Sequence, residues 1–454
     1  MKIMKFGGGC LKDSDDFQKV GRILCDETET TAVVVSAVHG VTDLICNAVH
    51  TALHSDEEIP SLIKSIELKH EEIMKSMIKN KEVLDITWNE IVGLLKRLER
   101  LFFGVAYTEE ISNSLMALIH SFGERICARL LVGVLKDLGR KAEAFDSDEI
   151  GLITDDFYDN ATAVLSEIRN NLSKNIKPMM ETNIIPVVTG YFGCSREGKV
   201  TTFGRNGSDY SAAVIAYGLE AGSLEIWKDV DGFMTADPRL VLNSQMIRSL
   251  SYYEAAELSY FGAKILHPRT VEPLRDMPIP ILIRNINDSL NQGTKLLAES
   301  RVRKDVVKSV TYNREISIVK IHGPGVGLKP GILGDLGHAL GNQRINIYSV
   351  ITSQTRINLI IDKKDQKAAY EALFYLSGGI IDKVEVENTV ALVAVVGKGI
   401  QRRKGIVARV FSAVSAENIN IQMISSGASE VAYYFLVKAD EVGRAVRAIH
   451  HEFF

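Results

Sequence analysis

Over the first 300 residues, short apolar segments alternate with helical stretches. Six of these segments are short, apolar and mostly β-branched, which is typical of buried strands. They span residues 1–6, 32–36, 141–145, 184–189, 224–227 and 279–284, and helical stretches such as 15–25, 125–138 and 209–218 lie between them. The alternation predicts an α/β fold, a mostly parallel sheet sandwiched by helices, which binds ligands at the carboxyl ends of its strands.

One part of this region breaks the alternation. Residues 56–103 are charged and helix-favouring, as in the run Glu-Leu-Lys-His-Glu-Glu-Ile-Met at 67–74. We interpret them as a helical insertion near the site. Their charges are expected to form a solvated face rather than a binding surface.

The last third of the chain contains an internal repeat. Residues 316–387 recur at 390–454 with an offset of 74 positions, and three glycines and an Ile-Asn-Ile run coincide under that shift. Each copy reads strand, glycine-rich turn, helix, strand, strand, helix, which is the βαββαβ order of ferredoxin-like modules. We therefore predict three domains, at 1–300, 308–387 and 388–454.

Composition narrows the class of protein. At 454 residues the chain is too long for a single core, and 46% apolar and 24% charged residues are ordinary for a globular protein. A net charge of −4 argues against binding to nucleic acid, and against binding to a membrane through a polybasic patch. The five cysteines show no Cys-x-x-Cys spacing, and the longest apolar runs are too short to cross a bilayer. We expect reduced thiols and a cytoplasmic protein.

Two glycine-rich segments suggest the chemistry. Lys5-Phe6-Gly7-Gly8-Gly9 places an ammonium beside backbone that can approach an anion closely. Residues 202–209, Thr-Phe-Gly-Arg-Asn-Gly-Ser-Asp, supply a guanidinium and a helix start, which favours a carboxylate. Neither segment has the spacing of a Walker loop. Together they predict phosphate at one end of a site and a carboxylate-bearing substrate at the other.

With further motifs, the chain resembles the aspartate kinases (aspartokinases) of the amino-acid kinase family over essentially its whole length, including their paired C-terminal ACT domains. The matching segments are 5–8, 34–37 with 41–42, 121–125, 203–209, 229–232 with 235–239, and 262–268. The resemblance implies phosphorylation of the side-chain carboxylate of L-aspartate by ATP, with Mg²⁺. It also implies a first step of lysine, threonine and methionine biosynthesis, amino-acid feedback control, and a homodimer or higher oligomer joined through the ACT domains.

The resemblance also implies roles for individual residues. The catalytic residues would be Lys5, Asp209 and Lys264, with Asp209 holding Lys5 rather than acting as a base. Those binding the substrate would be Ser36, Thr42, Glu124, Arg205 and Ser208. Those binding the nucleotide would be Lys5, Gly7, Gly8, Lys228, Asp229, Met234, Arg239, Lys264 and Ile265. An effector, lysine or threonine, would meet Gly331, Ile332, Asn346, Ile347 and Gln354. No dedicated metal-binding residues are predicted.

The chain departs from the family pattern in several places. Gly9 and Cys10 replace residues with hydroxyls after the two phosphate-loop glycines, Lys228 replaces a threonine, and Met234 replaces a tyrosine. Gln354 stands where the first ACT unit often has a glutamate, so a feedback amino acid should bind weakly. Two alternatives stay open: a catalytically weak amino-acid sensor, and a kinase for another acidic amino acid. The effector and the choice between dimer and tetramer are also left open.

Overall fold

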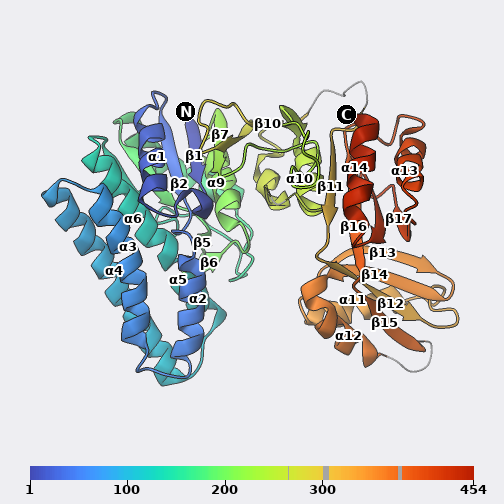
Figure 1. Ribbon diagram of the computed structural model, residues 1–454. Helices are drawn as coiled ribbons and strands as arrows, with labels where there is room; N and C mark the ends of the chain where they lie inside the picture. Colours follow the sequence, from blue (N-terminus) through green and yellow to red (C-terminus); the bar gives the residue numbers. More distant parts are fainter. Residues whose placement is uncertain (264, 300–305, 377–380) are drawn as a thin grey trace. The chain divides into compact units, whose positions relative to one another are not determined.

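The computed structural model describes residues 1–263, 265–299, 306–376 and 381–454 (Figure 1). The chain divides into two compact units. The first contains Met1–Phe233, Met246–Ala256 and Lys264–Ser300, and the second contains Met234–Gln245, Glu257–Ala263 and Arg301–Phe454. Within the described ranges, no helix is both long enough and apolar enough to cross a membrane.

The first unit is built on an eight-stranded sheet, in the order β3-β4-β2-β1-β7-β9-β10-β8. All neighbouring pairs are parallel except β9 with β10, so the predicted mostly parallel sheet is confirmed. A separate hairpin of β5 and β6 lies outside it. The strands are β1 (Lys2–Phe6), β2 (Thr31–Val35), β3 (Ala142–Phe145), β4 (Ile185–Thr189), β5 (Phe192–Cys194), β6 (Val200–Thr202), β7 (Ser223–Lys228), β8 (Ser249–Ser251), β9 (Ile281–Asn285) and β10 (Thr294–Leu297).

Successive side chains of a strand point to opposite faces of the sheet, so both faces carry side chains that need cover. Helices pack on both faces of this sheet. Met4 and Phe6 of β1 belong to the large core formed with helices such as α1 (Ser14–Cys25), α2 (Val41–Ala52) and α6 (Phe122–Asp137). Lys5, between them, points to the opposite face and meets α9 (Gly207–Gly218). Apart from the insertion helices, the other helical elements are η1 (Gly8–Cys10), α5 (Asn113–His120), α7 (Leu165–Asn175), α8 (Lys177–Glu181), η2 (Pro268–Leu274) and α10 (Tyr252–Tyr260), whose last four residues belong to the second unit.

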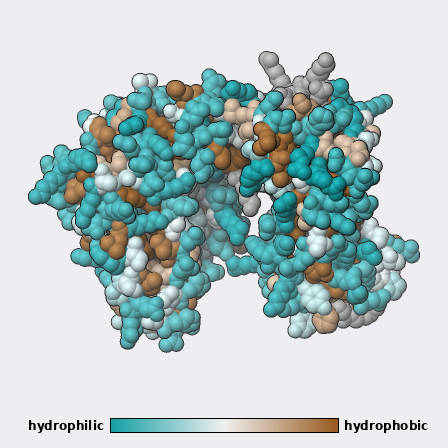
Figure 2. All heavy atoms as spheres, viewed as in Figure 1, coloured by the Kyte–Doolittle hydropathy of each residue, from teal (hydrophilic) through white to brown (hydrophobic). Residues whose placement is uncertain are grey.

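The predicted insertion is helical. Helices α3 (Ile59–Met77) and α4 (Lys81–Thr108) each bury one apolar side in the same core as α6. Their outer surface is mostly hydrophilic (Figure 2, left of the view). Exposed apolar residues include Leu68 and Ile86. This agrees with the solvated face expected from the sequence.

The second unit contains two four-stranded antiparallel sheets, each covered by two helices. One has the order β13-β14-β12-β15, and the other has the order β11-β16-β18-β17. The first module contains β12 (Ile316–His322), α11 (Ile332–Asn342), β13 (Ile347–Ser353), β14 (Arg356–Asp362), η3 (Lys363–Asp365), α12 (Gln366–Phe374) and β15 (Lys383–Glu387). The second contains β16 (Val390–Val396), α13 (Ile406–Ala416), β17 (Met423–Ser425), β18 (Ala432–Lys438), α14 (Val442–Phe453) and the preceding β11 (Ser309–Asn313).

The two modules repeat one another closely. Gly331 at the start of α11 and Gly405 at the start of α13 both have positive φ, at 90° and 85°. Glycine adopts this conformation without the clash that a β-carbon would cause. The fourth strand differs in origin, because β11 precedes the first module along the chain yet pairs with β16 of the second. The three-domain boundaries from the sequence stay a prediction.

Candidate active site at the carboxyl ends of the strands

Parallel pairing brings the candidate residues of the first unit to one edge of the sheet. Phe6 of β1 lies beside Val35 of β2 and Trp227 of β7, and Val35 lies beside Thr189 of β4. The residues that follow these strands therefore gather in space, as they do in other parallel sheets. They include the phosphate-loop glycines, Ser36 and Lys228.

A buried carboxylate lies between two lysines at this edge. The Lys5 ammonium lies 2.5 Å from Oδ1 of Asp209, and the Lys228 ammonium lies 3.0 Å from Oδ2. Lys5 and Asp209 are buried, whereas 19% of the Lys228 side chain is exposed. The sequence predicted Lys228 only as a nucleotide-side residue that replaces a threonine, so its pairing with Asp209 is a new observation.

The charges of this cluster fix the ionisation of Asp209. Burial alone would raise the pKa of Asp209, but the positive charges of Lys228 and Lys5 outweigh it and hold that pKa at about 2. Burial lowers the pKa of Lys5, and the Asp209 carboxylate opposes this change. At neutral pH the Asp209 carboxylate is ionised, and the two lysine side chains beside it suit an anionic ligand.

The glycine loop leaves little space for side chains. A β-carbon on Gly7 would lie 3.2 Å from the Lys5 ammonium nitrogen, and one on Gly8 would lie 3.3 Å from the Ala37 carbonyl oxygen. Gly9 packs against the Asp229 carboxylate, to which Lys12 forms an ion pair at 3.3 Å. The loop thus places backbone, rather than side chains, beside the lysine cluster.

A cavity of about 650 Å³ opens next to this loop. Among its lining residues are Gly8 and all five predicted substrate-binding residues: Ser36, Thr42, Glu124, Arg205 and Ser208. They come from the ends of β2 and β6 and from the starts of α2, α6 and α9. The structure therefore brings the substrate-side prediction together in one place.

Glu124 is buried in this cavity wall with part of its carboxylate unsatisfied. Its Oε1 accepts a hydrogen bond from the Ala37 N–H at 3.1 Å, while Oε2 has no hydrogen-bond partner among the described residues. Burial raises the pKa of Glu124 to about 8, and the backbone hydrogen bond from Ala37 offsets only part of this shift. A cationic ligand group would satisfy the free oxygen and restore the ionised form.

Arg205 is one of the cavity-lining residues and lies on the turn that precedes α9. Two residues of this turn have positive φ, Gly204 at 76° and Asn206 at 55°. The Arg205 side chain is exposed, and none of the described residues forms an ion pair with it. Its guanidinium is available to a carboxylate, for which the planar fork has the matching geometry.

Several predicted residues lie elsewhere. Met234 and Arg239 belong to the second unit, where Ser309 donates to the Met234 carbonyl and Arg239 pairs with Asp237. Ile265 is half-buried in the first unit, and Lys264 lies outside the described residues. In the first repeated module, Gly331 precedes α11, Ile332 is buried and Ile347 begins β13, while Asn346 and Gln354 are exposed.

Sequence reasoning missed other residues of the cavity. The lining also includes His39, Asp43, His120, Tyr158, Asp159, Tyr191 and Asn206. Tyr191 has φ of 74°, which is unusual for a bulky residue, and His120 Nε2 lies 3.2 Å from Cys46 Sγ. Of these, His39, Tyr191 and Asn206 had a weak sequence signal, because each adjoins a glycine near a predicted element.

A buried ion network supports the helix that carries Glu124. Arg125 donates to Asp146 at 2.5 Å and to Asp148 at 2.7 Å, and its guanidinium carbon lies 4.7 Å from the centre of the Phe192 ring. Arg129, one turn further along α6, also pairs with Asp146. These contacts attach the start of α6 to the loop after β3 and hold Glu124 at the cavity.

Comparisons with known proteins agree with this arrangement. Residues 1–285 match the model of the amino acid kinase family, and residues 393–453 match that of the ACT domain. The chain therefore belongs to the amino acid kinase family. Within it, the chain groups with the aspartokinases: aspartokinase 3, chloroplastic, of Arabidopsis thaliana is 30% identical over the whole chain, which covers 81% of that relative.

Longer relatives and solved structures extend the comparison. A bifunctional aspartokinase/homoserine dehydrogenase of Buchnera aphidicola is 31% identical, and the chain spans only 56% of its length. Crystal structures of E. coli aspartokinase III are 27% identical over the whole chain. The complex with lysine and aspartate has a TM-score of 0.86 and is covered to 99%, and the complex with aspartate and ADP has a TM-score of 0.84 and is covered completely.

Proposed function

We propose that the chain transfers the γ-phosphoryl group of ATP to the side-chain carboxylate of L-aspartate, giving 4-phospho-L-aspartate and ADP. The observation that carries this proposal is the cavity itself. It combines a Glu124 oxygen and an Arg205 guanidinium that have no partner among the described residues, and it adjoins the glycine loop beside Lys5 and Lys228. A zwitterionic acid and a polyphosphate need these charges.

The proposed binding mode follows from the charges. Glu124 receives the substrate ammonium and Arg205 binds its α-carboxylate, while Ser36, Thr42 and Ser208 offer hydroxyls to the remaining oxygens. The side-chain carboxylate is then free to face the glycine loop. Relatives support this reading, since E. coli aspartokinase III has been solved with aspartate and ADP.

The proposed reaction needs no general base. An oxygen of the substrate carboxylate forms a bond to the γ-phosphorus, the bond from that phosphorus to the β,γ-bridging oxygen breaks, and ADP leaves with the electron pair. The attacking carboxylate carries no proton, and Asp209, with its pKa of about 2, is too weak a base to take one. Lys5 and Lys228 stabilise negative charge as it shifts between oxygens, and Lys264 is expected to assist.

A magnesium ion fits this site only together with the nucleotide. The described residues contain no group of three or more His, Cys, Asp or Glu side chains suited to a metal ion, and Asp209 is already paired with two lysines. Asp229 beside Gly9 is the carboxylate that would complete a shell made mainly of phosphate oxygens and water. When bound, the ion neutralises phosphate charge.

We further propose that this reaction opens the synthesis of lysine, threonine and methionine in the cytoplasm, under feedback by lysine or threonine. A lysine complex of E. coli aspartokinase III supports the feedback reading.

Asn346 and Gln354 carry no charge for an effector ammonium, so titration calorimetry should detect only weak lysine or threonine binding, and Gln354→Glu should strengthen it. Tight binding by the unaltered chain would contradict this assignment.

Variants of the two substrate-side charges test the proposed binding mode. Arg205→Ala and Glu124→Ala should each raise the KM for aspartate at least tenfold, because each removes the partner of a substrate charge. Arg205→Lys should recover only part of the loss, since an ammonium lacks the planar fork. If the KM for ATP rose while that for aspartate stayed unchanged, the two halves of the site would have been assigned the wrong way round.

A further inference from the structure

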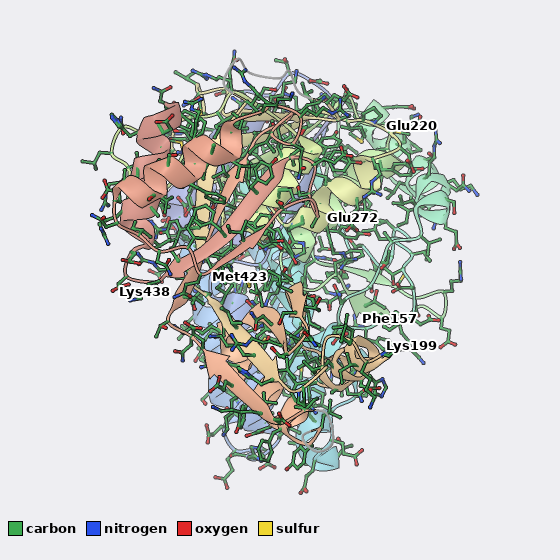
Figure 3. All side chains as sticks on the ribbon, turned by 90° about the vertical axis from the view of Figure 1, so that its right-hand side faces the viewer. Phe157, Lys199, Glu220, Glu272, Met423 and Lys438 are labelled. Carbon is green, nitrogen blue, oxygen red and sulfur yellow. The ribbon has the colours of Figure 1, made fainter. Side chains whose placement is uncertain are left out.

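Arg269 connects three segments at the edge of the substrate cavity. It is the second residue of η2, and Glu272 of the same short helix is labelled in Figure 3. Its guanidinium donates to the Ala161 carbonyl at 2.8 Å, to the Asn160 side-chain oxygen at 2.5 Å and to the Phe203 carbonyl at 3.5 Å. The guanidinium carbon also lies 4.6 Å from the centre of the Tyr210 ring.

These partners flank the turn that carries Arg205. Phe203 immediately precedes Gly204 and Arg205, and Tyr210 lies in the first turn of α9 behind them. The loop containing Asn160 also presents Tyr158 and Asp159 to the cavity. Phe157 and Lys199, labelled in Figure 3, belong to the same region of the first unit, and Thr202 donates to the Tyr158 carbonyl at 2.8 Å.

The turn packs directly on that loop. A β-carbon on Gly204 would lie 3.1 Å from the Asn160 side-chain oxygen and 3.2 Å from the Asp159 carbonyl oxygen. Arg269 bonds to both sides of this contact, so its planar fork fixes the distance between the loop and the turn. An ammonium could not serve the same set of acceptors while stacking on Tyr210.

We propose that Arg269 is a positioning residue for the substrate clamp: by tying Phe203 to residues 160 and 161, it holds the Arg205 turn where the guanidinium faces the cavity. This inference rests on the proposed function, because the clamp is defined by the carboxylate it binds. Small displacements of a positioning group weaken substrate binding strongly. Arg205 itself has no partner among the described residues to hold it, so its placement depends on the turn.

Kinetics of Arg269→Met and Arg269→Lys, assayed by ADP release, test the proposal. Both should raise the KM for aspartate on the order of tenfold, with a smaller fall in kcat and a KM for ATP within about twofold of the unaltered chain. Arg275→Met is the matched control, because Arg275 is exposed at the end of η2 and none of the described side chains pairs with it. An unchanged aspartate KM in folded Arg269→Met would overturn the proposal.

The double variant Arg205→Ala, Arg269→Met separates positioning from a general loss of stability. If Arg269 acts through Arg205, the double variant should have the aspartate KM of Arg205→Ala alone, because no clamp remains to be misplaced. Additive effects would mean that Arg269 acts by another route. If Arg269→Met fails to fold, Arg269→Lys provides the same comparison.

Amide hydrogen exchange provides a readout that needs no catalysis. Arg269→Met should speed exchange at residues 158–161 and 203–207 while other segments of the first unit keep their rates, and Arg275→Met should change neither segment. Local acceleration in a protein without aspartate kinase activity would support the positioning role and reject the proposed function. Unchanged exchange in both segments would reject the positioning role.

Discussion

At the scale of single residues, two buried carboxylates of the site are driven to opposite ionisation states. Asp209 lies between two ammonium groups and has its pKa held at about 2, whereas Glu124 has one backbone donor and a pKa raised by burial to about 8. Such divergent values are characteristic of functional sites. We infer that Asp209 stays ionised and holds the two lysines in place, and that Glu124 binds a positively charged group of the ligand.

The Asp209 cluster should control turnover rather than substrate affinity. Asp209→Asn and Lys5→Met are expected to lower kcat on the order of a hundredfold, because both disturb charge that acts on the transferring phosphoryl group. Steady-state kinetics measure this change. Lys2→Met is the control, since Lys2 is an ion-paired lysine near the opposite end of the same strand, bound to Glu27 and Glu225. A near-normal kcat in the Lys5 or Asp209 variant would show that this cluster does not take part in phosphoryl transfer.

Glu124 should make aspartate binding depend on pH. The free enzyme holds Glu124 largely protonated below its pKa of about 8, and the substrate ammonium favours the carboxylate, so binding releases a proton. The KM for aspartate should therefore fall as pH rises from 6 to 8, and Glu124→Gln should abolish this slope along with most of the affinity. A KM that is flat or rises over this interval would show that Glu124 does not receive the ammonium.

The sequence indicated the ion pair of Lys5 with Asp209 and the five substrate-side residues of the cavity, because those residues occur in motifs that resemble a known family. It did not indicate the pairing of Lys228 with Asp209, the raised pKa of Glu124 or the contacts of Arg269. Each of these depends on burial and on residues far away in the chain, such as residues 160 and 203 for Arg269. The catalytic and binding roles themselves stay predictions.

At the scale of elements, the site depends on the tight turn between β6 and α9. Gly204→Ala should raise the KM for aspartate severalfold or more, because its φ of 76° strains a β-carbon that would also press on Asn160. Gly139→Ala is the matched control: its φ is 80°, but nothing lies within 4 Å of the added carbon. Both variants should lose some thermal stability, and only Gly204→Ala should change KM. Equal kinetics for the two would show that the turn is not critical.

Element positions followed well from sequence where local pattern decides them. The six expected strands and the two repeated modules are present, because local sequence pattern determines short β-branched strands and glycine-bounded helices. Helices α3 and α4 occupy the segment predicted as an insertion. The sequence did not predict the pairing of β11 with β16. Tertiary contacts decide which sheet a five-residue strand joins, and here Val310 is buried in the core of the second module. The local sequence pattern does not predict such contacts.

At the scale of the whole molecule, the repeated modules expose strand edges. β13 and β17 each lie at the edge of a four-stranded sheet, and such edges favour pairing with another chain. We expect at least a homodimer joined through these modules, and sedimentation of the full chain at micromolar concentration measures this. Deleting residues from Val306 onward should leave a monomeric, poorly soluble kinase part. A full-length monomer, with or without amino acids, would contradict the expectation.

The most direct test of the assigned function is ADP release by the full chain with L-aspartate, L-glutamate and N-acetylglutamate as alternative acceptors, followed by detection of the acyl phosphate. We expect turnover with aspartate, little with the other two acids, and its loss in Asp209→Asn. Because Glu124 and Arg205 face the same cavity, a substrate must present an ammonium and a carboxylate together. No turnover with aspartate, or faster turnover with N-acetylglutamate, would contradict the assignment.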